Sequence, residues 1–473
     1  MQRRSLLSGR ELDESAGARP ILDPWTGLAR GEALLAGPEA VQLALAESYG
    51  ARAACAALTP FRRGEILEAM ALGVQARRAE LVEAIVGEAG KPLAFARGEV
   101  DRCIQTLRES ALEARRPADE MVPVEAAAAG AGRTGLLRRV PAGVMLGIAP
   151  FNFPLNLVAH KLAPAIAAGC PFILKPPMQA PTPALILGAL AVQAGWPEAA
   201  CQVILCEDSL AQAMVQDERP AVLSFTGSDT VGWKLKAIAG RKKVLLELGG
   251  SAPVLVLPDA DLDLVLRTVP VGAYAYAGQV CISVQRLLVH RDVAAALRER
   301  LVAAIEGLAW GDPQRAETIS GPMIDERATD RVEAWTRQAV EAGARVLAGG
   351  GREGQRLLRP VLLEGVGEDQ PFLSRELFGP GMAMQSFDSL DEAIGLLNEG
   401  PWGLQAGVFT RDVQALFRLH RELEVGGLIH DDAPTFRVDL MPYGGVKHSG
   451  LGREGPRWAV AELSEPRLMV VRA

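Results

Sequence analysis

From Gly143 onward the sequence alternates short apolar segments with longer helical ones, and this alternation constrains the fold more than any other feature. The apolar segments fall at residues 144–149, 172–174, 203–205, 222–225 and 244–248, and a second series falls near 254–257, 287–289 and 361–363. Short strands separated by helices form right-handed βαβ units, whose strands lie parallel in one sheet. We therefore predict an α/β fold with two parallel-sheet domains.

Length, charge and cysteine usage narrow the class of protein. A chain of 473 residues is too long for one hydrophobic core, and its net charge of −7 argues against nucleic acid as a partner. No apolar run reaches the ~18 residues of a membrane span, and the basic start lacks the apolar segment of a secretory signal. The six cysteines are scattered without CxxC pairs, so we expect no metal site, no disulfides and a cytoplasmic location.

Outside the α/β series, we expect helices in the N-terminal part of the chain and strands after it. Residues 38–116 have helical character, and the charges of residues 97–102, which are predicted to open one helix, are expected to face solvent. An Ala/Gly-rich run at residues 126–132 precedes a predicted strand at 135–141, and residues 467–471 form a predicted final strand.

Polar side chains come at the ends of four predicted strands. They are Asn152, Lys175, Ser228 and Glu247. Because the carboxyl ends of parallel strands meet at one edge of a sheet, we expect these side chains to line a common ligand site. Residues 229–237 form a predicted helix after Ser228, and the backbone N–H groups at a helix start favour a pyrophosphate.

The single G-x-G-x-x-G motif, at residues 349–354, lacks the context of a dinucleotide-binding fingerprint. That fingerprint follows a strand and opens a helix, whereas a predicted strand follows the motif here. We interpret these glycines as a flexible turn, so a Rossmann-like nicotinamide site would have to be built without the motif.

Cys281 lies in a run of small and polar residues, at positions 275–286. A structural cysteine behaves as a small hydrophobe and normally lies in an apolar run, so this context hints at a catalytic thiol. Taken alone, the hint is outweighed by core packing, because free cysteine is among the most buried residue types.

Seven motifs give the hint its context, and through them the sequence resembles the aldehyde dehydrogenase family from about Asp23 to Glu454. The motifs are PFNFP (150–154), KPP (175–177), FTGS (225–228), ELGG (247–250), GQVCIS (278–283), ELFGP (376–380) and PYGGVKHSG (442–450). Their order and spacing are those of the family, which makes the resemblance specific.

The resemblance implies a reaction and a role for particular residues. Cys281 would attack the aldehyde carbon as a thiolate, and the Asn152 amide and the Cys281 N–H would bind the oxyanion. Oxidation would leave a thioester, which water activated by Glu247 would hydrolyse to a free acid. Lys161 and Glu454 match positions proposed in the family for a proton relay; the alternative is that they are surface or helix-end charges.

The resemblance also implies a site for NAD or NADP. Lys175 would bind the adenosine ribose, Ser228 the pyrophosphate and Glu376 the nicotinamide ribose, and Phe378 would pack nearby. Further cofactor contacts are expected from Ala149, Pro150, Phe151, Met178, Phe225, Gly227, Leu248 and Gly249. Members that prefer NAD usually have Glu at the position of Met178. Because a carboxylate there would repel a 2′-phosphate, its absence predicts that both cofactors are used.

The substrate is the part of the function that the sequence constrains least. The pocket is expected to contain Phe153, Arg102, Ile282 and Arg437, with His160 as a further polar candidate. Residues 432–439 resemble those of lactaldehyde-, phosphonoacetaldehyde- and semialdehyde-type members, which suggests a small polar or anionic aldehyde. Val280 places no charge beside the nucleophile, which argues against a phosphonate, and a structural salt bridge is the alternative role for Arg437.

The family fold implies three parts. Residues 1–118 and 138–249 would form the cofactor-binding domain, residues 250–448 the catalytic domain, and residues 119–137 and 456–473 a small β oligomerisation element. Exposed edge strands invite pairing, so we expect a homodimer or homotetramer.

Three other functions compete with this interpretation. One is a coenzyme A-acylating aldehyde dehydrogenase, which Glu247 disfavours because acylating members lack this glutamate. Another is a non-catalytic binding or structural protein on the same fold, although such a protein has no physical need for Cys281, Asn152 and Glu247 together. The third is a cysteine hydrolase, but none of the five histidines lies in a recognisable motif.

Overall fold

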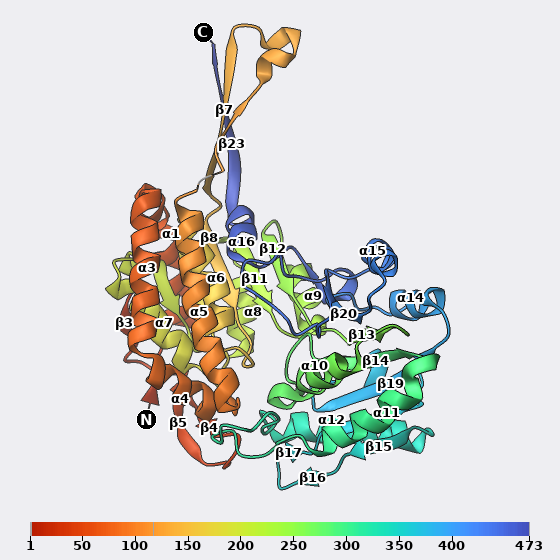
Figure 1. Cartoon of the computed structure of the whole chain (residues 1–473). Helices are drawn as coiled ribbons and strands as arrows, with labels where there is room; N and C mark the ends of the chain where they lie inside the picture. Colours follow the sequence, from red (N-terminus) through yellow and green to blue (C-terminus); the bar gives the residue numbers. More distant parts are fainter. Residues whose placement is uncertain (1, 117, 473) are drawn as a thin grey trace.

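Two layered α/β bodies and a projecting arm of three strands make up the computed structural model, which describes residues 2–116 and 118–472 (Figure 1). The first body contains most of the N-terminal half of the chain, and the second contains most of the C-terminal half. Met1, Pro117 and Ala473 belong to predicted segments but lie outside the described residues. The predicted α/β class is confirmed.

The first body is built on an eight-stranded sheet whose five central strands run parallel. Its order is β22 (Gly450–Leu451), β12 (Lys243–Glu247), β11 (Pro220–Thr226), β8 (Val144–Ile148), β9 (Phe172–Lys175), β10 (Cys201–Val203), β2 (Leu6–Leu7) and β3 (Arg10–Glu11). The predicted strand at 203–205 therefore lies two residues earlier, at β10. The edge strand β22 comes from near the C-terminus, so the end of the chain returns to the first body.

Side chains of the central strands alternate between two hydrophobic cores because strand residues point to opposite faces. Val144 and Leu146 of β8 pack in one core with helices α1 (Pro38–Gly50), α8 (Asp208–Gln216) and α9 (Asp229–Ile238). Met145 packs in the other core. The helices of that core are α3 (Pro60–Ala76), α4 (Arg78–Ala89), α5 (Leu93–Ala114), α6 (Asn156–Ala168) and α7 (Thr182–Gln193), with the short α2 (Arg52–Ala57) beside them.

The second body has a seven-stranded sheet that is parallel except for one edge strand, β15. Its order is β15 (Arg345–Gly349), β18 (Val361–Glu364), β19 (Gly381–Phe387), β14 (Val284–His290), β13 (Ala252–Val256), β20 (Gln405–Phe409) and β21 (Gly427–His430). The helices around it are α10 (Leu262–Tyr274), α11 (Arg291–Glu306), α12 (Glu326–Glu341), α13 (Pro371–Ser374), α14 (Leu390–Asn398) and α15 (Val413–Glu422). Residues 350–351 connect β15 to the short β16 (Arg352–Glu353), and residues 354–356 form a turn before β17 (Leu357–Leu358), so no helix follows the glycine motif.

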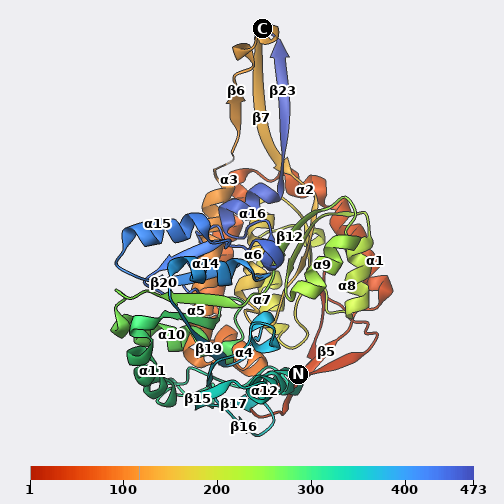
Figure 2. The same cartoon turned by 90° about the vertical axis from the view of Figure 1, so that its right-hand side faces the viewer.

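The arm is an antiparallel sheet of β6 (Glu120–Val122), β7 (Arg133–Pro141) and β23 (Ser464–Arg472), in the order β23-β7-β6. It extends away from both bodies, and β23 runs toward its tip (Figure 2). Leu468, Met469, Val470 and Val471 of β23 are all exposed. β1 (Gln2–Arg3), β4 (Ala18–Leu22) and β5 (Ala29–Leu34) form a small separate sheet, and α16 (Pro456–Glu462) leads into β23. None of the described helices is long and apolar enough to cross a membrane.

Helix α5 corrects one prediction. It begins at Leu93 instead of Arg97, and Glu99, which was expected to face solvent, is only 1% exposed. The Glu99 carboxylate pairs with the equally buried Lys91 and accepts the backbone N–H groups of Leu155 (2.9 Å) and Asn156 (3.1 Å). The first N–H groups of a helix have no partner within it, so a carboxylate here stabilises the start of α6. Glu99 thereby fixes the loop that precedes α6.

We predict that Glu99→Gln destabilises the protein strongly. The substitution leaves Lys91 buried without its counter-charge, a change that typically costs about 3–5 kcal/mol. Asp101→Asn on the same helix is the matched control, because the Arg78–Asp101 pair is 40% and 54% exposed at its side chains and such pairs contribute at most about 1 kcal/mol. Urea unfolding of both variants measures the difference, and equal unfolding midpoints would show that the buried pair is dispensable.

Candidate active site

The four polar residues of the strand ends lie along one edge of the first sheet. Glu247 ends β12 and Lys175 ends β9, while Asn152 follows β8 and Ser228 follows β11. These strands are neighbours in the order β12-β11-β8-β9. Asn152, Lys175 and Glu247 are buried, and Ser228 begins α9 without a hydrogen bond from its side chain to that helix. At this edge, Asn152 Oδ1 and Glu247 Oε1 have no hydrogen-bond partner among the described residues.

The backbone before Cys281 is held in an unusual conformation. Tyr276, Ala277 and Gly278 all have positive φ angles, of 54°, 54° and 65°. Left-handed conformations of non-glycine residues are unfavourable by roughly 1–3 kcal/mol each, so surrounding contacts must fix them. The buried Gln279 side chain supplies such contacts: it donates to the carbonyls of Tyr276 and Pro322, both at 3.2 Å, and accepts the N–H of Ile324 at 2.9 Å.

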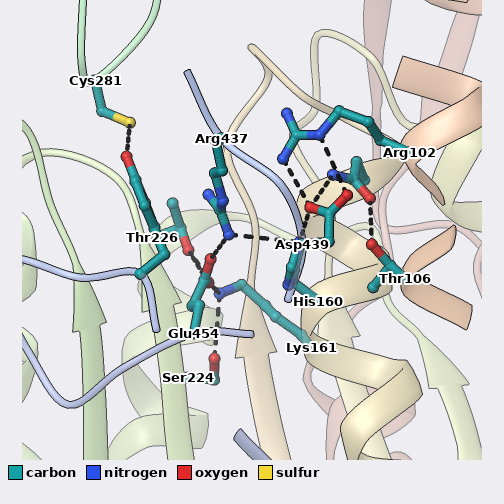
Figure 3. A network of polar contacts seen from close by, with 12 residues as sticks. Arg102, Thr106, His160, Lys161, Ser224, Thr226, Cys281, Arg437, Asp439 and Glu454 are labelled. Atoms are coloured by element: carbon teal, nitrogen blue, oxygen red, sulfur yellow. Dashed lines mark hydrogen bonds and ion pairs between the residues drawn. The ribbon is translucent and has the colours of Figure 1, made fainter. Parts of the chain in front are cut away.

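Cys281 is partly exposed, whereas the other five cysteines, all within the described residues, are buried and unpaired. Asn152 Nδ2 donates to the Gln279 carbonyl at 3.0 Å, which places this amide beside the cysteine loop. The Cys281 sulfur lies 3.0 Å from the Tyr443 hydroxyl, at the upper left of Figure 3. The structure therefore places the Asn152 amide beside the Cys281 loop and the Tyr443 hydroxyl beside the Cys281 sulfur.

Burial controls the ionisation of the groups around Cys281. Burial, reinforced by the carboxyl of Glu247, raises the pKa of the Cys281 thiol well above its usual value; the Tyr443 hydroxyl and the Arg437 charge oppose the rise. Burial also raises the pKa of Glu247 to about 8, with a further contribution from Glu454. Glu247 is therefore neutral at pH 7, and its Oε1 has no hydrogen-bond partner among the described residues.

Lys161 and Glu454 lie inside the protein, so the interpretation of these two residues as surface charges is wrong. Lys161 Nζ lies 3.5 Å from Glu454, and Arg437 donates to the same carboxylate at 3.2 Å (Figure 3). Lys161 also donates to Thr226 at 2.7 Å and Ser224 at 3.1 Å. Burial alone would raise the pKa of Glu454, but the positive charges of Lys161 and Arg437 hold it below its usual value. Glu454 is thus ionised close to a neutral Glu247.

Asp439 contacts two further basic side chains of this region, Arg102 and His160. It accepts from Arg102 at 2.7 Å and contacts His160 Nε2 at 2.8 Å. Burial, followed by the charge of Arg437, lowers the pKa of His160, so this imidazole is neutral at pH 7. Arg102 and His160 therefore have structural partners, and Arg102 also lies 5.9 Å from the Phe153 ring.

Arg437 forms the salt bridge that was its alternative role, but it keeps an unused donor. Its guanidinium pairs with Glu454 and lies 3.6 Å from the centre of the Tyr443 ring. Its Nε has no hydrogen-bond partner in the part of the chain that the structure describes. Ile282 is buried with Tyr443 in a small apolar cluster, so the predicted pocket residues Ile282 and Arg437 both contact this tyrosine.

The predicted cofactor residues suit a dinucleotide. A Cβ atom on Gly249 would lie 2.0 Å from Glu376 Oε2, so only glycine lets this carboxyl approach the strand-end backbone. Glu376 Oε1 is buried without a partner among the described atoms, and burial raises the pKa of Glu376 to about 8. Phe151 and Phe378 meet edge to face at 5.9 Å. These are polar and aromatic groups that the protein leaves available for a ligand.

The other predicted cofactor residues lie at the same edge or pack beneath it. Ala149, Phe225 and Leu248 are buried, Pro150 follows β8, and Gly227 leaves no space for a Cβ, which would meet the Phe225 ring at 2.7 Å. Met178 packs against the cluster of Ile21, Ala33 and Leu205. Lys175 Nζ pairs at 2.7 Å with Asp208, a carboxylate that the sequence analysis did not identify.

Sequence reasoning also missed Tyr443, Gln279 and Asp439. Tyr443 is part of the PYGGVKHSG motif, but the motif does not indicate that its hydroxyl contacts Cys281, which lies far away in the sequence. Within the described residues, no group of three His, Cys, Asp or Glu side chains is arranged to hold a metal ion.

The site combines Asn152 and the buried Glu247 from the edge of the first sheet with Cys281 from the loop before β14 of the second. The aldehyde dehydrogenase family model matches residues 12–469, and the chain belongs to this family. A 3-sulfolactaldehyde dehydrogenase of Priestia aryabhattai is 40% identical over 462 residues, covering 98% of this chain and 96% of its own. Aspartate-semialdehyde dehydrogenase 1 of Pseudomonas canavaninivorans is 41% identical over 450 residues, with 95% of each chain covered.

Solved structures agree with this assignment. Aldehyde dehydrogenase 21 from Physcomitrella patens, in complex with the reaction product succinate, has a TM-score of 0.96 and 36% identity, covering 100% of this chain and 98% of that one. A glyceraldehyde-3-phosphate dehydrogenase from Methanocaldococcus jannaschii, complexed with NADP, has a TM-score of 0.93 and 32% identity, covering 98% and 100%. The predicted family is confirmed.

We predict that iodoacetamide modifies Cys281 alone in the native protein, because the other five cysteines are buried. The raised pKa of Cys281 means that the reaction will be slow at pH 7 and will accelerate as the pH rises, since the thiolate is the reacting form. Peptide mapping by mass spectrometry identifies the modified residue, with urea-unfolded protein as the control in which all six react. Native labelling at any other cysteine would contradict the structure.

Proposed function

We propose that this protein oxidises a small polar or anionic aldehyde to a free carboxylic acid with NAD or NADP. The observation that carries the proposal is the buried Glu247 carboxyl in the site of the partly exposed Cys281, since its Oε1 has no hydrogen-bond partner among the described residues. A buried carboxyl without a structural partner is costly unless it has a chemical task. A merely structural protein would gain nothing from it.

Cys281 starts the reaction as a thiolate that attacks the aldehyde carbon. The negative charge on the aldehyde oxygen is then stabilised by the Asn152 amide and the Cys281 N–H, and one such donor is typically worth about 10²–10³ in rate. Lys175, Ser228 and Glu376 would hold a nicotinamide cofactor, and the Phe151–Phe378 pair would pack against it. The cofactor would supply the hydride acceptor for the oxidation, which would leave Cys281 as a thioester.

Glu247 completes the cycle by accepting a proton from the water that attacks the thioester. The carboxyl must be ionised to do so, and it loses its proton as the pH rises through about 8. Turnover limited by hydrolysis should therefore increase toward that pH. Glu454 and Lys161 are close enough to influence Glu247 electrostatically and form a route by which the proton leaves.

Relatives and cationic side chains support the substrate class. The similar enzymes named above act on sulfolactaldehyde and aspartate semialdehyde, and one similar structure contains succinate. Arg102 and Arg437 supply positive charge beside Phe153 and Tyr443. The free Nε of Arg437 is the donor that best suits an anionic substituent on the substrate.

The assembly is a homodimer or homotetramer that uses the arm. The exposed apolar residues of β23 and its position as an edge strand favour pairing with a second copy of the chain. The six unpaired cysteines suit the reducing cytoplasm.

The function is tested by absorbance at 340 nm with aliphatic, hydroxy- and carboxylate-bearing aldehydes, using NAD and NADP separately. We expect reduced cofactor with the intact enzyme, the highest kcat/KM for small polar or anionic aldehydes, and none with Cys281→Ala. Coenzyme A should neither accelerate the reaction nor be acylated, because Glu247 directs the thioester to water. Activity that survives in Cys281→Ala, or an acylated coenzyme A, would reject the proposal.

Cofactor choice provides a second prediction, at Met178. We expect Met178→Glu to weaken NADP binding at least about tenfold, equivalent to about 1.4 kcal/mol, because the new carboxylate would repel the 2′-phosphate. NAD binding should change little. Quenching of protein fluorescence gives both Kd values, with Met178→Gln as the uncharged control. An equal change for both cofactors would show that Met178 does not face the ribose.

A further inference from the structure

Tyr443 occupies a fixed position beside the proposed nucleophile. Its backbone N–H and carbonyl form an isolated antiparallel bridge with Glu454, at 3.0 and 2.6 Å. Its ring is buried with Ile282 and Leu404, and its hydroxyl ends 3.0 Å from the Cys281 sulfur. The hydroxyl contacts a reacting atom, yet the mechanism above assigns it no task.

Arg437 also restrains Tyr443. Its guanidinium lies 3.6 Å from the centre of the ring and is held in turn by Glu454, the residue that forms the backbone bridge with Tyr443. A cation over a buried aromatic ring is favourable, and a planar guanidinium can stack on the ring where an ammonium cannot. Tyr443 therefore has little freedom to move its hydroxyl away from the sulfur.

The charged groups that face Cys281 mostly oppose its ionisation. Glu247 and Glu376 both raise the pKa of the thiol, in addition to burial. The Tyr443 hydroxyl and the Arg437 charge lower it. Burial and the proximity of Cys281 raise the pKa of Tyr443 well above its usual value, so this hydroxyl keeps its proton and can donate it in a hydrogen bond.

We propose that Tyr443 is a catalytic residue, whose hydroxyl donates a hydrogen bond to the Cys281 thiolate and is held in place by Arg437. This role rests on the proposed function, because it takes Cys281 as the nucleophile. The thiol proton leaves to water, Tyr443 retains its own proton, and the hydrogen bond stabilises the sulfur anion. When the thiolate attacks the aldehyde carbon, the sulfur loses its negative charge. Hydrolysis of the thioester later releases Cys281 as a thiolate again.

The test measures the thiolate without cofactor or substrate. The rate of Cys281 alkylation by iodoacetamide across a pH series gives the midpoint of thiol ionisation. Hydrogen bonds to charged groups are typically worth enough to shift a pKa by about one unit or more. Tyr443→Phe, which keeps the ring, should therefore raise the midpoint by about one pH unit. Arg437→Lys, which keeps the charge but cannot stack, should raise it as well.

Tyr274→Phe is the matched control. Its hydroxyl is also buried and donates to the Val361 carbonyl at 3.0 Å, and it forms no contact with Cys281 in the described structure. We expect its alkylation midpoint to equal that of the wild type. Circular dichroism and unfolding midpoints establish that all variants are folded.

An unchanged or lowered midpoint in Tyr443→Phe would overturn the proposal, and an unchanged midpoint in Arg437→Lys would overturn the part assigned to Arg437. Either result is distinguishable from failure of the proposed function. That failure would appear as aldehyde oxidation by Cys281→Ala, a result that does not depend on the alkylation midpoints.

Discussion

The site depends on an unequal division of charge between two buried carboxyls. Glu454 pairs with both Lys161 and Arg437 and is ionised, while Glu247 has no ion pair among the described residues and is mostly protonated at pH 7. Two carboxyls whose environments separate their pKa values can serve different tasks in one reaction. Here the ionised one organises the cations, and the neutral one remains free to exchange a proton near Cys281.

The folding of the chain makes this division possible. The segment that follows β21 leaves the second body and returns to the first sheet, where β22 pairs with β12 at Glu247 and Leu246. On its way it supplies Arg437, Asp439 and Tyr443, and Glu454 follows β22. Lys161 and Glu247 come from the first body, and Cys281 comes from the loop before β14 of the second. The site therefore exists only when both bodies and the returning segment are in place.

Local rules were sufficient to predict the strand-end residues. The alternation of strands and helices predicted parallel sheets, and parallel strands place Asn152, Lys175 and Glu247 at one edge. The motif order predicted the family, which the comparisons confirm. The roles of the individual residues and the three domain boundaries remain predictions.

Contacts between distant residues were beyond these rules. Glu99 reads as a surface charge because its partners Leu155 and Asn156 are 56 and 57 residues away. The Tyr443 hydroxyl meets a sulfur 162 residues earlier in the chain. The left-handed turn at Tyr276 and Ala277 has no propensity signal, since neither residue favours a positive φ. Tertiary contacts, which no local pattern encodes, hold all three.

The protonation state of Glu247 is the most direct test of this account. Infrared difference spectra between the wild type and Glu247→Gln isolate the C=O stretch of the protonated Glu247 carboxyl. The same spectra for Glu376→Gln identify the band of Glu376, whose pKa is also raised. We predict that the Glu247 band is present at pH 7 and disappears as the pH rises through about 8. Absence of the band at pH 7 would mean that Glu247 is already ionised beside Cys281, and would contradict the division of charge on which the site depends.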